Sequence, residues 1–223
     1  MNHRFKKLLC VLLSAGLYSG STVFATATTQ DAQEWRFRVF LDNSEIGYHN
    51  FTLTDFGESQ EMRTEADFKV KFLLVPIYKY RHNNTEIWDG QCLEAIESKT
   101  RANGSSYAVN GTARNQDFLI SMTTGDVEDR ATLNGCVMTF AYWDPDFLAQ
   151  PRLLNTQTGE YIDVAAELVG DDVITVRGEP VPAYRYRLTA EGLNIELWYS
   201  QDQEWLGLES AVGGGRRLRY ELT

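Results

Sequence analysis

The sequence predicts an all-β protein: a large curved antiparallel sheet that forms a β-roll or an open barrel, with one short helix near residues 144–150. Three observations lead to this class. Apolar and polar residues alternate along many short segments, as they do in half-buried strands. Turn-forming pairs separate these segments at short intervals. No long amphipathic helical pattern occurs, which argues against parallel βαβ units.

Strand alternation is clear in the first half of the chain. A strand is expected over residues 35–41, where every second residue is apolar, and Asp42-Asn43 then turns the chain into a return strand over 46–55. Two longer strands follow, over 61–74 and 78–88. This half is therefore expected to be a series of hairpins.

Three Asn-Gly pairs predict further hairpin turns, because a type I′ turn needs positive φ at both central residues. They are Asn103-Gly104, Asn110-Gly111 and Asn134-Gly135. We expect the last pair to start a returning strand over residues 136–142.

The short helix is expected at Asp144-Pro145-Asp146, which offers an N-cap, a proline at the first helical position and a carboxylate near the helix N-terminus. Pro151 limits it to one or two turns, and residues 152–160 are expected to form an ordered loop. The remaining strands are expected at 161–169, 172–177, 183–189, 193–200, 205–212 and 217–222.

The N-terminus has the pattern of a cleavable signal peptide, residues 1–27. Basic residues precede an apolar stretch over 8–18, which is shorter than the roughly 20 residues of a membrane span. Small residues then allow cleavage after Ala25 or Ala27. Residues 28–223 are predicted to form a single antiparallel β domain that is exported, most simply to the periplasm, and has no transmembrane span.

The charge of the chain argues against nucleic-acid partners. Residues 1–27 contain three of the 21 basic residues and none of the 31 acidic ones, so the remainder carries a formal charge of −13. Nucleic acids instead bind to patches of lysine and arginine. The sequence also contains no phosphate loop, Gly-x-Ser-x-Gly elbow or HExxH motif, and His49 and His82 lack a ligand spacing, so we predict neither a cofactor nor a metal.

Cys92 and Cys136 are predicted to form a disulfide. They are the two cysteines outside the predicted signal peptide, and an exported protein folds in an oxidising compartment. The alternative is a reactive thiol or metal pair, but the Cys-x-x-Cys spacing that would favour it is absent.

The segment 78–88 contains the strongest candidate site. Residues two apart on a strand share a face, so one surface would carry Tyr80, His82, Asn84, Glu86 and Trp88. His82 and Glu86 are weak candidates for general acid–base catalysis. The alternative is a row of hydrogen-bonded polar side chains without chemistry, since no nucleophile accompanies them.

Aromatic residues are numerous enough to line a cavity inside such a sheet. The expected ligand-binding residues are Tyr80, His82, Trp88, Tyr142, Trp143 and Trp198. The alternative is that these side chains simply form an aromatic core.

Several segments together resemble a known family. They are Trp35-Arg36-Phe37-Arg38-Val39, Ile46-Gly47-Tyr48-His49, the Tyr-x-Tyr-x-His run that continues to Glu86, Trp88 and Cys92-Leu93, the run over 139–143, Leu153 to Gly159, and the closing Arg217-x-Arg-Tyr-Glu-Leu region. The chain resembles a family of exported bacterial proteins known only as a domain of unknown function. It is distantly similar to a second uncharacterised envelope family built as a large curved β-roll. The resemblance implies a periplasmic or cell-envelope location and assigns no catalytic residues.

These observations favour a non-catalytic exported envelope protein that binds a small apolar ligand or a segment of an envelope protein in an aromatic-lined concavity. One alternative is a hydrolase-type enzyme that uses His82 and Glu86. Another is an outer-membrane β-barrel, although the alternating segments do not sustain the apolar face that contact with lipid requires.

Overall fold

The computed structural model describes residues 31–72 and 75–223. The predicted signal peptide lies outside the described residues. One antiparallel sheet of 13 strands dominates, accompanied by a two-stranded sheet. The strands are β1 (Ala32–Leu41), β2 (Ser44–Asp55), β3 (Gln60–Phe72), β4 (Val75–Asp89), β5 (Cys92–Ala102), β6 (Ser105–Arg114), β7 (Asp117–Thr124), β8 (Val127–Asn134), β9 (Arg152–Leu154), β10 (Tyr161–Asp163), β11 (Ala165–Val176), β12 (Glu179–Ala190), β13 (Leu193–Tyr199), β14 (Trp205–Val212) and β15 (Arg216–Leu222).

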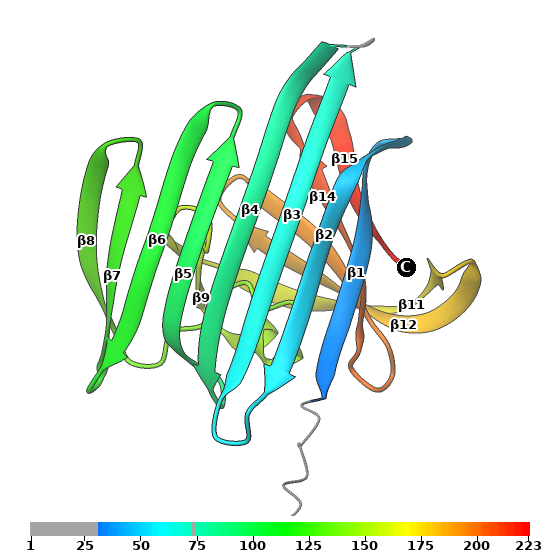
Figure 1. Ribbon diagram of the computed structural model, residues 1–223. Coiled ribbons are helices and arrows are strands. Elements are labelled where there is room, and N and C mark those ends of the chain that lie inside the picture. Colours follow the sequence, from blue (N-terminus) through cyan, green and yellow to red (C-terminus); the bar gives the residue numbers. More distant parts are fainter. Residues whose placement is uncertain (1–30, 73–74) are drawn as a thin grey trace, which may run out of the picture.

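The large sheet has the strand order β11-β12-β13-β14-β15-β1-β2-β3-β4-β5-β6-β7-β8. The first strand therefore pairs with the last, from Phe37↔Leu222 to Leu41↔Leu218. This pairing joins two halves, β1–β8 and β11–β15, which face one another across the interior (Figure 1). The edge strands β8 and β11 are not paired with each other, so the prediction of a curved, open all-β sheet is confirmed.

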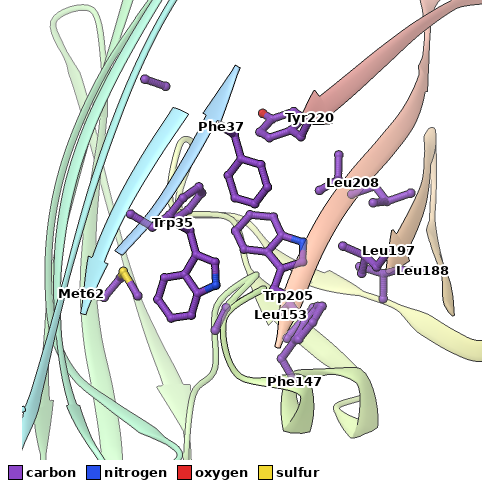
Figure 2. Packing of buried hydrophobic residues seen from close by; sticks show 14 of the residues in the cluster. Trp35, Phe37, Met62, Phe147, Leu153, Leu188, Leu197, Trp205, Leu208 and Tyr220 are labelled. Atoms are coloured by element: carbon purple, nitrogen blue, oxygen red, sulfur yellow. The ribbon is translucent and has the colours of Figure 1, made fainter. Parts of the chain in front are cut away.

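The core lies between the two halves. Along β1 the alternation has the expected effect, because Trp35, Phe37 and Val39 are 2%, 1% and 0% exposed whereas the intervening arginines are exposed. Figure 2 shows Phe37 pointing toward Trp205 of the opposite half. Their ring centroids are 4.4 Å apart, so aromatic packing holds the two inner faces together.

A crossing segment, residues 135–164, leads from the edge strand β8 to the edge strand β11. It lies between the two halves (Figure 1), and its side chains Phe147, Leu153 and Leu154 are each 0% exposed. Backbone hydrogen bonds attach it to the sheet, since Val137 O accepts from Leu93 N at 2.9 Å. The expectation of a hairpin at Asn134-Gly135 with a returning strand over 136–142 is wrong, because this part of the chain enters the interior.

The crossing segment contains the expected short helix, a 3₁₀ helix over Pro145–Ala149. Asp144 caps it by accepting a hydrogen bond from Asp146 N at 3.0 Å. The loop expected over residues 152–160 instead begins with β9, which pairs with β10.

Two further expectations about turns and strands need correction, and one turn is confirmed. Asn103-Gly104 does form a turn, with φ of 48° and 95°. Asn110-Gly111 lies inside β6, where a Cβ on the glycine would approach the Phe118 ring to 2.4 Å. The glycine there serves close packing and not a turn. The two strands expected over 161–169 and 172–177 are largely one strand, β11, bent at a register shift beside Gly170.

Cys92 and Cys136 form the predicted disulfide, with their Cα atoms 5.0 Å apart. It joins the start of β5 to the start of the crossing segment. Within residues 31–72 and 75–223, no helix combines the length and apolar character needed to cross a membrane.

The disulfide predicts a measurable contribution to stability. Replacing Cys92 and Cys136 together by serine is expected to lower the free energy of unfolding by about 2–4 kcal/mol, because the bond restricts the unfolded chain. Urea denaturation of the two proteins tests this, with reduced wild type as the control, which should match the double variant. Finding both thiols free in non-reducing peptide mapping would contradict the prediction.

Candidate functional site

A cavity of about 640 Å³ lies between the two halves of the sheet. Its walls come from β1–β4 on one side and from β13–β15 on the other, and its floor comes from the crossing segment. The floor residues are Phe140, Ala141, Tyr142, Trp143, Asn155, Thr156 and Gln157.

Strand β4 runs down one wall from the β3–β4 hairpin to the end near the crossing segment. Six of its side chains line the cavity: Ile77 at the rim and then, in order of depth, Tyr78, Tyr80, His82, Asn84 and Glu86. The alternation predicted for this strand therefore holds, and the face it defines is concave. Their exposure falls along the strand, from 38% at Tyr78 to 4%, 6% and 3% at the last three.

The rim of the cavity is mainly apolar. It includes Ile77, which is 54% exposed, and the half-buried Leu193, Val212 and Leu218 at the ends of β13, β14 and β15. Arg216 also lies at the rim, where its Nε is 3.0 Å from a carboxylate oxygen of Asp42. An apolar molecule could thus enter without displacing a charged group.

Two histidines lie side by side on the wall. His49 of β2 and His82 of β4 are both paired with Ala66 of β3, whose small side chain leaves room for the two rings. The ring centroids are 6.5 Å apart. Sequence reasoning placed His82 on this surface but missed His49, because the register between strands brings the two together.

Both imidazoles are held neutral. Burial lowers the pKa of His82 to about 4, and burial together with the neighbouring His82 lowers the pKa of His49 well below its usual value. The Nδ1 of His82 is 2.8 Å from the Thr100 hydroxyl. The Nδ1 of His49 is 3.2 Å from the hydroxyl of Tyr220. Each ring is thereby fixed in orientation.

Glu86 is the most deeply placed acidic group. One carboxylate oxygen accepts from Asn84 Nδ2 at 3.0 Å and the other from Trp88 Nε1 at 3.1 Å. Burial raises the pKa of Glu86 to about 7, although donors from Asn84, Thr139 and Trp88 act in the opposite direction. The carboxyl is therefore close to half-protonated at neutral pH.

Buried polar groups concentrate around this wall. In the described part of the chain, the fully buried polar side chains belong to β3, β4, β5 and the crossing segment: Thr64, His82, Asn84, Glu86, Ser98, Thr100 and Thr139. Three atoms of cavity-lining residues are buried without a hydrogen-bond partner, namely His49 Nε2, Asn84 Oδ1 and Trp143 Nε1. Leaving such groups unpaired costs about 1–3 kcal/mol each, so the structure keeps hydrogen-bonding capacity at this place.

The structure brings together four of the six expected ligand-binding residues, since Tyr80, His82, Tyr142 and Trp143 all line the cavity. Trp88 does not line it: this side chain is 1% exposed and packs edge-on against Trp143 at 5.6 Å. Trp198 lies elsewhere, because its indole Nε1 donates to Asp172 of β11 at 3.0 Å. These two tryptophans support the fold and do not face the cavity.

The geometry does not assemble a catalytic set from the described residues. His82 and Glu86 lie on the same wall, but each has separate hydrogen-bond partners. The Thr100 hydroxyl next to His82 does not belong to the cavity lining. Among the residues that the structure describes, no group of three or more His, Cys, Asp or Glu side chains converges as a metal site would require.

The fold and the cavity define a class of protein: an open, barrel-like antiparallel sheet that encloses an aromatic-lined cavity. The chain belongs to the family described as Domain of unknown function (DUF6134), whose model matches residues 37–223. No curated protein matches the chain.

The chain is also similar in fold to a crystal structure, that of a beta-barrel-like protein of Domain of Unknown Function DUF1849 from Brucella abortus. The TM-score is 0.63 at 9% sequence identity, over 85% of this chain and 94% of that chain. The resemblance expected from the sequence, to an uncharacterised domain and to a second uncharacterised β family, is thus confirmed.

The buried Glu86 predicts a pH dependence. Between pH 4.5 and 7 the unfolded chain has released the proton that the folded carboxyl still holds. The free energy of unfolding of the wild type should therefore fall with rising pH relative to that of Glu86→Gln, by about 3 kcal/mol in total. Above pH 7 the difference should stay constant.

Urea denaturation across this pH range measures the effect. The matched control is Glu94→Gln on the exposed face of β5, which leaves the buried carboxyl in place and should retain the wild-type slope. Parallel stability curves for wild type and Glu86→Gln would contradict the prediction.

Proposed function

We propose that the protein is a non-catalytic exported envelope protein that binds a small apolar ligand in the cavity between the two halves of its sheet. The observation that carries the proposal is the cavity itself. Its volume of about 640 Å³ falls in the range of small-molecule sites, roughly 300–1,000 Å³. Its lining is mostly aliphatic and aromatic with a few convergent polar groups, which is the usual composition of such sites.

Export is supported by two features. The Cys92–Cys136 disulfide is a bond that persists in oxidising compartments and is rare in the cytosol. The predicted signal peptide gives the route, and the negative charge of residues 28–223 keeps an exported protein soluble.

The hydrolase alternative has less support. His82 and Glu86 do lie in a concavity, as an enzyme would require, and a carboxyl with a pKa near 7 suits a general acid. However, the two groups do not contact one another, and the nearest hydroxyl, that of Thr100, is outside the cavity lining. Binding of a ligand, unlike hydrolysis, requires only the surface that lines the cavity.

The membrane-embedded alternative also has less support. The outward face of the first half carries paired ions, including Arg81 with Asp67 at 2.9 Å and Lys99 with Glu97 at 2.7 Å. Charged side chains on a surface that faces lipid are costly. These pairs are typical of a surface in contact with water.

The cavity can be tested by filling it. Ser210 of β14 lines the cavity and is half-buried, so Ser210→Phe should reduce the volume open to a ligand. We expect 1:1 binding of N-phenyl-1-naphthylamine, an uncharged apolar dye, to the wild type, followed by fluorescence. The variant should bind it about tenfold more weakly.

The matched control is Ala211→Phe, since the neighbouring residue on the same strand is exposed and points to the opposite face. Its affinity for the dye should equal that of the wild type. Absence of saturable binding to the wild type, or equal loss in both variants, would reject the proposal.

A further inference from the structure

The polarity of the cavity changes with depth in a defined direction. The rim is mainly aliphatic, at Ile77, Val212 and Leu218, and the deepest wall carries Asn84 and Glu86. An amphiphile that followed this gradient would place its polar head at the bottom and its apolar body toward the rim. A ligand held the other way round would put apolar carbon against buried polar groups, which is unfavourable.

The middle of the cavity offers hydrogen-bonding groups that the protein itself does not use. Within the described chain, no side chain or backbone group pairs with the hydroxyl of Tyr80, the hydroxyl of Tyr142 or the Nε2 of His82. They come from β4 and from the crossing segment, so they approach the cavity from the wall and from the floor. Hydroxyls donate and accept, so together these groups suit a head that does both.

Asn84 gives a second, independent indication of a polar ligand. It is 6% exposed and lines the cavity, and its Nδ2 is used by Glu86 while its Oδ1 has no partner. A buried acceptor of this kind is destabilising unless a donor reaches it. The hydroxyl or amide N–H of a head group is such a donor.

The charges around the cavity exclude an ionic head group. The one arginine or lysine among the described lining residues is Arg216, which lies at the rim and is paired with Asp42. An anionic head at the bottom would therefore lack a counter-ion and would lie near the Glu86 carboxyl. A cationic head would have Glu86 alone as its counter-ion, and that group is 3% exposed and already hydrogen-bonded. Burying an unpaired charge is costly in either case.

We propose that the ligand is an uncharged amphiphile that binds head first, with a hydroxyl-, ester- or amide-bearing head beside Tyr80, His82, Asn84 and Tyr142 and with its alkyl body directed to the rim. This inference rests on the proposed function, because it assumes that the cavity binds a small molecule. It adds the chemical class of the head and the direction in which the ligand lies.

Displacement of bound N-phenyl-1-naphthylamine by three ligands that share a twelve-carbon chain tests the head group. They are monolauroylglycerol, laurate and dodecyltrimethylammonium, each used below its critical micelle concentration at pH 8. The uncharged ligand should displace the dye with an affinity at least tenfold higher than either ion. Equal or tighter binding of laurate or of the ammonium ligand would overturn the inference while leaving the proposed function intact, whereas failure of the dye to bind would remove both.

Tyrosine variants test the partners of the head. Tyr80→Phe and Tyr142→Phe remove only hydroxyls, so each should weaken the binding of monolauroylglycerol by about 2–10-fold and weaken the binding of the dye, which carries no hydroxyl, by less. Tyr184→Phe is the matched control, because Tyr184 is 37% exposed and does not line the cavity. Unchanged affinity for monolauroylglycerol in both cavity variants would overturn the assignment.

The direction of binding has its own measurement, made at saturating ligand so that a change in the affinity of a variant does not affect it. Bromine quenches nearby tryptophan fluorescence, and Trp143 lies in the floor. Subtracting the emission of Trp143→Phe from that of the wild type gives the emission of Trp143 alone. Glycerol esters brominated at carbon 2 of the acyl chain should quench it more than esters brominated at carbon 12, and the reverse order would overturn head-first binding.

Discussion

The burial of the crossing segment between the two halves is the packing interaction on which the other features depend. An open sheet of this curvature has an interior that must be filled, and Phe147 and Leu153 fill its lower part at 0% exposure. Two parts of this segment, Phe140–Trp143 and Asn155–Gln157, form the floor of the cavity. The depth of the cavity is therefore set by where the crossing segment stops, and the disulfide fixes its beginning to β5.

The same packing explains how a row of polar side chains is tolerated inside an aromatic core. His82 and Glu86 are buried, yet each has a partner on a neighbouring strand, on its own strand or on the crossing segment: Thr100 for His82, and Asn84, Trp88 and Thr139 for Glu86. Buried polar groups that are satisfied in this way specify a unique arrangement of the elements that supply the partners. In the described chain the buried polar side chains gather at the wall of the cavity and directly behind it, and departures of this kind from hydrophobic patterning are expected at functional sites.

The sequence predicted which side chains share a face within one strand, but not how neighbouring strands are aligned with one another. Period-two alternation predicted that Tyr80, His82, Asn84, Glu86 and Trp88 share a face, and they do. Alternation within a strand does not show that Trp88 is covered by Trp143, nor that β2 and β4 flank β3 in the register that brings His49 beside His82. The returning strand predicted after Asn134-Gly135 was wrong, because a turn-forming pair does not determine whether the next residues pair with the sheet or enter the interior.

The pairing of β1 with β15 has a consequence for how the protein reaches this structure. Both halves are built from neighbours in sequence, so each can form hairpin by hairpin, but their junction joins residues 37–41 to residues 218–222. Such a non-local contact forms late and slowly, since almost the whole chain must be ordered first. The cavity between the halves therefore cannot exist while the polypeptide is still being synthesised. The cavity forms only once β15 has paired with β1, and a truncation of the last strand would abolish the cavity as a whole without touching most of its wall.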